Sequence, residues 1–240
     1  MPSKWEEIWR RREVPDQPRP GENLEAFLLR ADGYDTPFAS LDQESWLRWV
    51  RRIYQRVNLQ PNESIFEIGC GAGAFLIEAW RRGCTVGGVD LSPHLIAIAR
   101  SIMAEGHFEE ADALEFSFNN SWDVVAACGV MLYLPSREEA ESLIKVMASA
   151  ARRSIVLLDL PDVARRDQAE AFRRSTLGED LYRERYRGLA HLYFDRDAIR
   201  RLLLGLGFGA IAIEDQDLEN YPNGAFRFNV IARKRDSPDG

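Results

Sequence analysis

The sequence predicts an α/β protein built on a doubly wound, mostly parallel sheet. Apolar runs of strand length alternate with helical patterns of about 10–15 residues over most of the chain, which is typical of βαβ units. The first run, Ser64 to Ile68, leads into a segment with glycine at 69, 71 and 73, and acidic residues end the next two strands. A buried strand, a glycine-rich turn and a helix together indicate a nucleotide-binding site at the carboxyl edge of the sheet.

Composition limits the classes of protein that fit. The chain has 240 residues, 45% of them hydrophobic, and a formal net charge of −7, which disfavours nucleic acid as a partner. It contains no apolar run of about 18 residues and no signal-peptide pattern at its charged N-terminus, so we expect a cytoplasmic protein without a membrane span. Three cysteines in apolar surroundings indicate free thiols, and we expect no metal site because CxxC and His-rich clusters are absent from the sequence.

The first 60 residues are expected to form a helical cap or lid. Trp5, Ile8 and Trp9 lie at helical spacing in the stretch 3–12, which is either a mobile lid or a helix docked by its tryptophans. A Pro-rich linker follows, and further helices are expected over 24–30 and 42–57, the second with Asp42 as its N-cap. The core is expected to span 61–235, and 236–240 to form a tail.

Within the core, the apolar periodicity predicts the remaining elements in order. After the first strand we expect helices over 75–82, 93–104 and 138–151, the first of them turning helical at Ala74, and strands over 85–89, 107–111, 122–127 and 154–158. Residues 161–193 are rich in Arg and Glu and predict a helical insertion that forms part of the substrate pocket. A helix over 194–206 and an edge pair of antiparallel strands, 208–213 and 226–232, complete the core.

Acidic residues at the strand ends decide between two ligands for the glycine-rich loop. Asp90 lies 21 residues after Gly69, where a carboxylate can bind both ribose hydroxyls, and Asp112 ends the third strand. A nicotinamide dinucleotide and S-adenosylmethionine both fit this frame. Glu67, an acid inside the buried strand, favours the second, because a cationic ligand explains the burial of a carboxylate whereas a pyrophosphate would be repelled.

These motifs, Glu67-x-Gly69-x-Gly71-x-Gly73 followed by Asp90 and Asp112, resemble those of the class I S-adenosylmethionine-dependent methyltransferases. The resemblance covers about 64–232 and implies a Rossmann-like seven-stranded sheet of order 3-2-1-4-5-7-6 with strand 7 antiparallel. It also implies which residues bind the cofactor: the methionine part would lie on Glu67, Gly69, Cys70, Gly71 and Gly73, the ribose on Asp90, and the adenine on Leu91, Asp112 and Ala113. Cys128, after the fourth strand, would offer a backbone contact. Cys128-Gly129-Val130-Met131 departs from the Asn/Asp-Pro-Pro-Tyr/Phe motif of many amide and amino-base methylating enzymes, so that chemistry is not expected.

The second substrate is expected to lie near the insertion. Transfer to a hydroxyl needs a general base, and His191, at the C-terminal end of the insertion, is the best candidate by its ordinary pKa; a structural histidine is the alternative. Tyr133, Tyr186 and Asp159 are candidates for substrate binding. Arg183, Arg185 and Arg187 form either a solvated face or a site for an anionic acceptor.

The sequence therefore predicts a methyltransferase that acts on a small-molecule acceptor, with an O-acceptor favoured over an N-acceptor, and with a possible role in the biosynthesis of a natural product. The alternatives are an NAD-dependent oxidoreductase and a methyltransferase-like binding protein without activity. We expect S-adenosylmethionine as cofactor, a monomer or homodimer, and no nucleic acid or membrane as partner.

Overall fold

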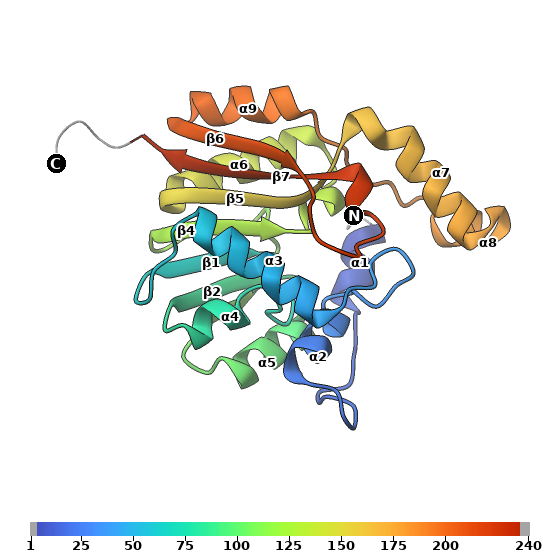
Figure 1. Cartoon of the computed structure of the whole chain (residues 1–240), viewed down its shortest axis with the longest axis horizontal. Coiled ribbons are helices and arrows are strands. Elements are labelled where there is room, and N and C mark those ends of the chain that lie inside the picture. Colours follow the sequence, from blue (N-terminus) through green and yellow to red (C-terminus); the bar gives the residue numbers. More distant parts are fainter. Residues whose placement is uncertain (1–3, 236–240) are drawn as a thin grey trace.

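A computed structural model describes residues 4–235 and shows one seven-stranded sheet with helices on both faces (Figure 1). The strand order, β3-β2-β1-β4-β5-β7-β6, is the one predicted. β7 runs antiparallel to both of its neighbours, and the other pairs are parallel. The strands are β1 (Ser64–Ile68), β2 (Thr85–Asp90), β3 (His107–Glu110), β4 (Trp122–Cys128), β5 (Ala151–Pro161), β6 (Phe208–Asp215) and β7 (Arg227–Lys234). The predicted tail, 236–240, lies outside the described residues.

Three helices cover one face of the sheet: α3 (Gln43–Arg56), α4 (Ile77–Arg81) and α5 (Pro93–Ile102). Asp42 caps α3 as predicted, because its Oδ1 accepts from the Ser45 amide at 2.9 Å, and Ser92 caps α5. Trp46, Trp49 and Tyr54 of α3 are almost fully buried in this layer. Because α3 supplies the largest side chains of this core, it is part of the domain body rather than a detached cap.

The opposite face is covered by α6 (Arg137–Ala150) and α9 (Arg196–Gly205). Ser136 and Asp195 cap them. The central strands β1 and β4 are buried along almost their whole length, as expected for parallel strands covered on both faces. The three cysteines, all among the described residues, are buried and unpaired.

Several boundaries differ from the sequence prediction by one to three residues, and two of these differences bear on the site. The helix after the glycine-rich loop begins at Ile77 instead of Ala74, because residues 74–76 still form turns and the loop must close before a helix can start. β5 extends to Pro161, beyond the predicted 158, because β7 pairs with it past a register shift between Leu157 and Leu160. Asp159 lies in that shift with a φ of 60°, so this bulge re-aims its side chain at the edge of the sheet.

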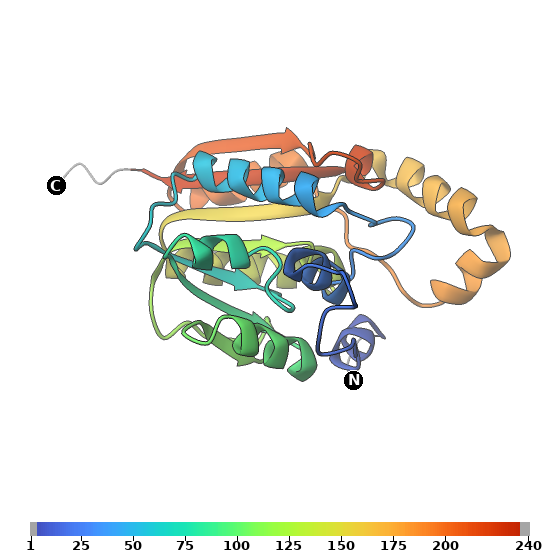
Figure 2. The ribbon, with the colours of Figure 1, turned by 60° about the horizontal axis from the view of Figure 1, so that its bottom comes forward.

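Helices from both ends of the core gather at the carboxyl end of the parallel strands (Figure 2). They are α1 (Lys4–Arg10) and α2 (Leu24–Ala31) from the N-terminal segment, and α7 (Arg166–Leu177) and α8 (Glu179–Arg185) from the insertion. The predicted insertion after β5 is therefore helical, as expected. Among residues 4–235, none of the helices has the length and apolar character needed to cross a membrane.

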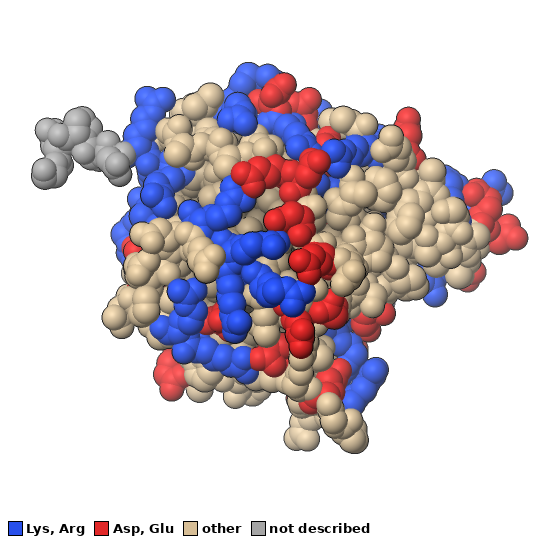
Figure 3. Space-filling model, in the orientation of Figure 1, with Lys and Arg blue, Asp and Glu red and all other residues tan. Residues whose placement is uncertain are grey.

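A stripe of arginines on α3 is the most basic surface in Figure 3, and acidic residues flank it. Arg51 pairs with Glu78 at 2.7 Å, and Arg52 pairs with Asp217 at 2.9 Å. Arg56 likewise pairs with Glu214 at 2.5 Å. Exposed pairs of this kind add little stability. The charges of these three arginines are therefore matched locally.

Candidate functional site

A cavity of about 490 Å³ opens at the carboxyl end of the sheet, beneath α1, α2 and the insertion. Its volume is in the range of small-molecule sites. All of the predicted site residues line it except Gly73. Gly73 is required for another reason: its φ is 94°, and a Cβ there would lie 2.4 Å from Cε of Met103 at the end of α5. The cavity therefore brings together the residues predicted for the cofactor and those predicted for the acceptor.

Two carboxylates hold the glycine-rich loop in shape through its backbone amides. Asp90 accepts from Gly71 N at 2.9 Å with Oδ2 and from Ser92 N at 2.9 Å with Oδ1. Asp32, at the C-terminal end of α2, accepts from Ala72 N at 2.5 Å and from Ala74 N at 3.0 Å. A pyrophosphate bound to these amides would have to displace both carboxylates, which argues against the dinucleotide alternative.

Glu67 lies beneath this loop as a buried acid without compensation. Its side chain is 3% exposed, and among the described residues its Oε2 has no hydrogen-bond partner. Burial raises the pKa of Glu67 well above its usual value, and the charges of Asp32 and Asp90 raise it further. Burial also raises the pKa of Asp90, and it raises that of Asp32 to about 7. Three carboxyl groups that disfavour one another's ionisation form a site prepared for a positively charged ligand.

The residues predicted for adenine, Leu91, Asp112 and Ala113, line the same cavity. Cys128, for which a backbone contact to the cofactor was expected, lines it as well. Asp112 is partly accessible, and its Oδ1 accepts from Leu114 N at 2.9 Å, which leaves Oδ2 as the further acceptor. A second acceptor atom on a loop acid is the feature needed to bind an exocyclic amino group.

His191 lies in the other half of the cavity, enclosed by aromatic rings. It stacks on Trp5 of α1 with ring centroids 5.0 Å apart, and Tyr133 and Tyr186 meet it edge-on at 5.8 and 5.9 Å. Trp5 is itself held by a hydrogen bond from Nε1 to the Ala190 carbonyl at 2.8 Å. The N-terminal helix thus packs directly on the predicted base and on Tyr133, one of the predicted substrate residues.

Two buried arginines, missed by the sequence reasoning, influence His191. Withdrawal from water lowers the pKa of His191 well below its usual value, and the positive charges of Arg227 and Arg173 lower it further. Arg173 comes from α7 and Arg227 begins β7, and they are 5% and 4% exposed. At neutral pH the imidazole is therefore uncharged, and these same causes make it a weaker base than a solvent-exposed imidazole.

The predicted substrate residue Asp159 is already engaged by protein groups. Its Oδ2 accepts from Tyr221 Oη at 2.8 Å, and its Oδ1 accepts from Gln216 Nε2 at 3.4 Å. Arg227 Nη1 lies 4.0 Å from Oδ2. Asp159 lines the cavity but chiefly offsets the charge of Arg227, which leaves little of the carboxylate for a ligand.

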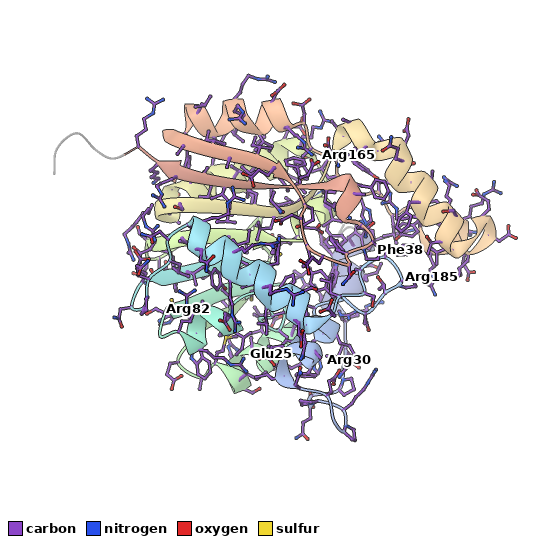
Figure 4. The ribbon with its side chains drawn as sticks, in the orientation of Figure 1. Glu25, Arg30, Phe38, Arg82, Arg165 and Arg185 are labelled. Atoms are coloured by element: carbon purple, nitrogen blue, oxygen red, sulfur yellow. The ribbon has the colours of Figure 1, made fainter. Side chains whose placement is uncertain are left out.

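Of the predicted exposed arginines, only Arg185 lines the cavity. Figure 4 shows it on α8, near Phe38 of the segment that follows α2. Arg183 instead pairs with Glu179 at 2.7 Å on its own helix, as on a solvated face.

Comparison with known proteins is consistent with this geometry. A methyltransferase-domain family model matches residues 65–154, from β1 into β5. An rRNA uracil-C5 methyltransferase of Dechloromonas aromatica is 32% identical over 160 residues, or 63% of this chain and 37% of that protein. A trans-aconitate 2-methyltransferase of Escherichia coli is 33% identical over 90 residues, or 36% of this chain and 35% of that protein. The matched part of the chain thus spans little more than a third of either relative.

Solved structures extend the likeness across the whole fold. Magnesium protoporphyrin IX methyltransferase from Synechocystis, with bound S-adenosylhomocysteine, superposes with a TM-score of 0.57 at 18% identity and covers 96% of this chain and 92% of its own. An N-methyltransferase from Bradyrhizobium japonicum, in complex with S-adenosylhomocysteine, gives 0.58 at 17% identity and covers 90% of this chain and 100% of its own. Together with the order of the strands, the glycine-rich loop and the strand-end acids, these matches show that residues 65–154 match a methyltransferase domain and that the chain has the fold of the class I S-adenosylmethionine-dependent methyltransferases.

Proposed function

We propose that this protein transfers a methyl group from S-adenosylmethionine to a small-molecule acceptor. The observation that supports this most strongly is Glu67, a buried carboxyl group with an unpartnered oxygen beneath the glycine-rich loop, flanked by Asp32 and Asp90. A ligand with a sulfonium and an ammonium group supplies the positive charge that these acids lack. When bound, the cofactor supplies an electrophilic methyl group for in-line displacement.

Different residues of the chain would bind different parts of that cofactor. Glu67 with Gly69, Cys70 and Gly71 would receive the methionine part, and Asp90 would accept from the ribose hydroxyls. Leu91 and Ala113 would pack on the adenine while Asp112 accepts from its amino group, and Cys128 would offer a backbone contact. Gly73 would contribute by shaping the loop, because it lies off the cavity.

The acceptor would bind on the insertion side, where Tyr133 and Tyr186 form aromatic walls beside His191. The two curated relatives carry names with different acceptors, an rRNA uracil and trans-aconitate. An enclosed, largely apolar cavity favours a small molecule over a polynucleotide. We propose a hydroxyl acceptor, in keeping with a role in metabolite or natural-product biosynthesis, with an amine as the alternative.

His191 would act as the general base for such a hydroxyl. Its ring is neutral at physiological pH and is fixed by Trp5, so a ring nitrogen can take the proton that the acceptor oxygen loses. The segment 1–60 would then act as a cap through α1, because Lys4 Nζ donates to the Arg187 carbonyl at 2.9 Å and Trp5 binds Ala190. These contacts close the cavity on the acceptor side, and closure excludes water from the reaction.

Replacement of Asp90 by alanine is expected to weaken S-adenosylhomocysteine binding by more than ~10-fold, through the loss of charge-assisted hydrogen bonds. The carboxylate also fixes Gly71 N and Ser92 N, so part of this loss will come from the loop. Isothermal titration calorimetry measures the effect. Methionine analogues that lack the ribose separate the loss of ribose hydrogen bonds from the disturbance of the loop, since only the disturbance would weaken their binding. An unchanged affinity for S-adenosylhomocysteine would contradict the ribose role.

Replacement of His191 by alanine is expected to lower turnover by about 100-fold or more while cofactor affinity stays within about threefold of wild type. Turnover is followed as S-adenosylhomocysteine release with an acceptor identified by screening. His94→Ala is the matched control, because its imidazole lies outside the cavity and bonds the Val14 carbonyl. Normal turnover in the His191 variant would assign that residue a structural role.

A further inference from the structure

The walls of the cavity are electrically polarised along its length. Carboxyl groups gather at the glycine-rich loop, where Glu67, Asp32 and Asp90 converge. Guanidinium groups gather at the insertion end, where Arg173, Arg185 and Arg227 line the same cavity. The acidic end suits the cationic methyl donor. The basic end lies beside His191, Tyr133 and Tyr186, on the side proposed for the acceptor.

Arg173 is the least compensated charge at this end of the cavity. It is 5% exposed, and its guanidinium makes one hydrogen bond, from Nη2 to the hydroxyl of Tyr193 at 2.7 Å. Its Nε is buried without an acceptor, and among residues 4–235 no carboxylate lies within ion-pair distance of it. Burial of an unpaired charge is costly unless a ligand compensates it.

Arg227 differs because its charge is partly balanced. Its Nη1 donates to the Asp159 carbonyl at 3.2 Å and lies 4.0 Å from the Asp159 carboxylate. The two arginines face one site, because both line the cavity that contains His191, and the charge of each lowers the pKa of that residue. The buried groups of this end, Arg173, Arg227 and Asp159, therefore carry a net charge of about +1, which matches a single carboxylate better than a doubly charged phosphate.

The surroundings also indicate the shape of the ligand. Trp5, Tyr133 and Tyr186 surround His191, and Arg173 lies over the ring of Tyr186 with its central carbon 5.9 Å from the centroid. Flat aromatic walls beside a guanidinium suit a planar, apolar body that carries an anionic group.

From these observations we infer that the methyl acceptor is a small carboxylic acid whose carboxylate binds to Arg173 and Arg227. The inference rests on the proposed methyltransferase function and specifies its acceptor. A bound carboxylate would offset the two guanidinium charges and so raise the pKa of His191. Substrate binding would thereby strengthen the base that it needs. The groups that face His191 in this effect are Trp5, Tyr133, Tyr186, Asp159 and the two arginines.

The test uses the full chain saturated with S-adenosylhomocysteine and three probes of one shape: benzoate, phenyl phosphate and benzamide. Binding is followed by calorimetry, and the three histidines of the chain are titrated by ¹⁵N NMR with and without each probe. We expect benzoate to bind in the millimolar range and to raise the pKa of His191, while His94 and His107 do not respond. Neutral benzamide and dianionic phenyl phosphate should bind more weakly than benzoate.

Arg173→Met is expected to weaken benzoate binding by at least ~10-fold, because it removes charge-assisted hydrogen bonds while preserving side-chain length. Arg174→Gln, at the next position on α7 but 42% exposed and paired with Glu179, should leave benzoate binding unchanged. S-Adenosylhomocysteine affinity should stay at the wild-type value in both variants, which also reports that they fold.

Benzamide binding as tightly as benzoate, or benzoate binding without a rise in the pKa of His191, would overturn the inference. If phenyl phosphate binds more tightly than benzoate, the site accepts a phosphate and not a carboxylate, and the inference is overturned as well. If the Arg173 variant does not fold, the comparison of probes on the wild-type chain still decides. If the wild-type chain binds S-adenosylhomocysteine but not benzoate, the acceptor class alone is refuted. If it does not bind S-adenosylhomocysteine, the proposed function is refuted.

Discussion

Glu67→Gln is expected to weaken binding of S-adenosylhomocysteine by about 10–100-fold, because a buried charge-assisted hydrogen bond to the ligand's ammonium group becomes a neutral one. The substitution keeps the shape of the side chain and, among the described residues, breaks no hydrogen bond to Oε2. Isothermal titration calorimetry at neutral pH measures the change. The effect should be larger than that of any single substitution on the adenine side, where each contact is neutral or partly exposed.

A matched ligand and a matched variant show whether the loss of affinity in Glu67→Gln arises at the ligand's ammonium group. 5′-Methylthioadenosine lacks the amino-acid part, so its affinity should be the same in wild type and Glu67→Gln. Glu110→Gln removes the same charge from an exposed position at the end of β3, and it should leave both affinities unchanged. Equal weakening of both ligands by Glu67→Gln would mean that Glu67 acts on the whole loop and not on the ammonium group.

Cofactor binding near neutral pH is expected to release on the order of one proton per bound molecule. The pKa of Asp32 is raised to about 7 and that of Glu67 is raised well above its usual value, so the empty site holds protons that solvent-exposed carboxyls would have lost. A cationic ligand favours the ionised carboxylates and lowers both pKa values, which expels protons. Calorimetry in phosphate and in Tris, whose ionisation enthalpies differ, measures the number released.

The same linkage predicts a trend among ligands and variants. S-Adenosylmethionine should release more protons than S-adenosylhomocysteine, because its sulfonium adds a second positive charge beside the acids. Asp32→Asn should reduce the release, whereas Asp35→Asn, at an exposed position on the same turn, should not. In the empty protein the raised pKa of Asp32 also means that stability falls as pH rises from about 4 to about 7. Identical heats in the two buffers would contradict the account of the acidic site.

The fold could be predicted from the sequence because its signals are local. The apolar runs of β1 and β4, the Ser92-Pro93 start of α5 and the glycines after Ile68 each specify an element within a few residues. The order of the sheet was implied by the family resemblance that the motifs at the strand ends carry. The end of β5 could not be predicted, since its extension depends on pairing with β7 about 70 residues later.

The site was predicted where a motif defines it and missed where distant segments meet. Asp32 looks like a turn residue before Gly33-Tyr34, and its role appears only through contacts with amides 40 and 42 positions away. Arg173 lies in a run of charged residues that reads as a solvated helix face, and only the contact of α7 with Tyr193 buries it. Arg227 begins a strand at the end of the core, and no spacing in the sequence relates it to Asp159.

The central claim, that the acidic loop binds a cationic adenosine ligand, is tested most directly by calorimetric titration of the full chain with S-adenosylmethionine, S-adenosylhomocysteine and NAD in parallel. We expect both sulfur ligands to bind with one site per chain. We expect NAD to give no saturable heat, because Glu67, Asp32 and Asp90 repel its pyrophosphate. Tight binding of NAD with no response to the two sulfur ligands would contradict this claim.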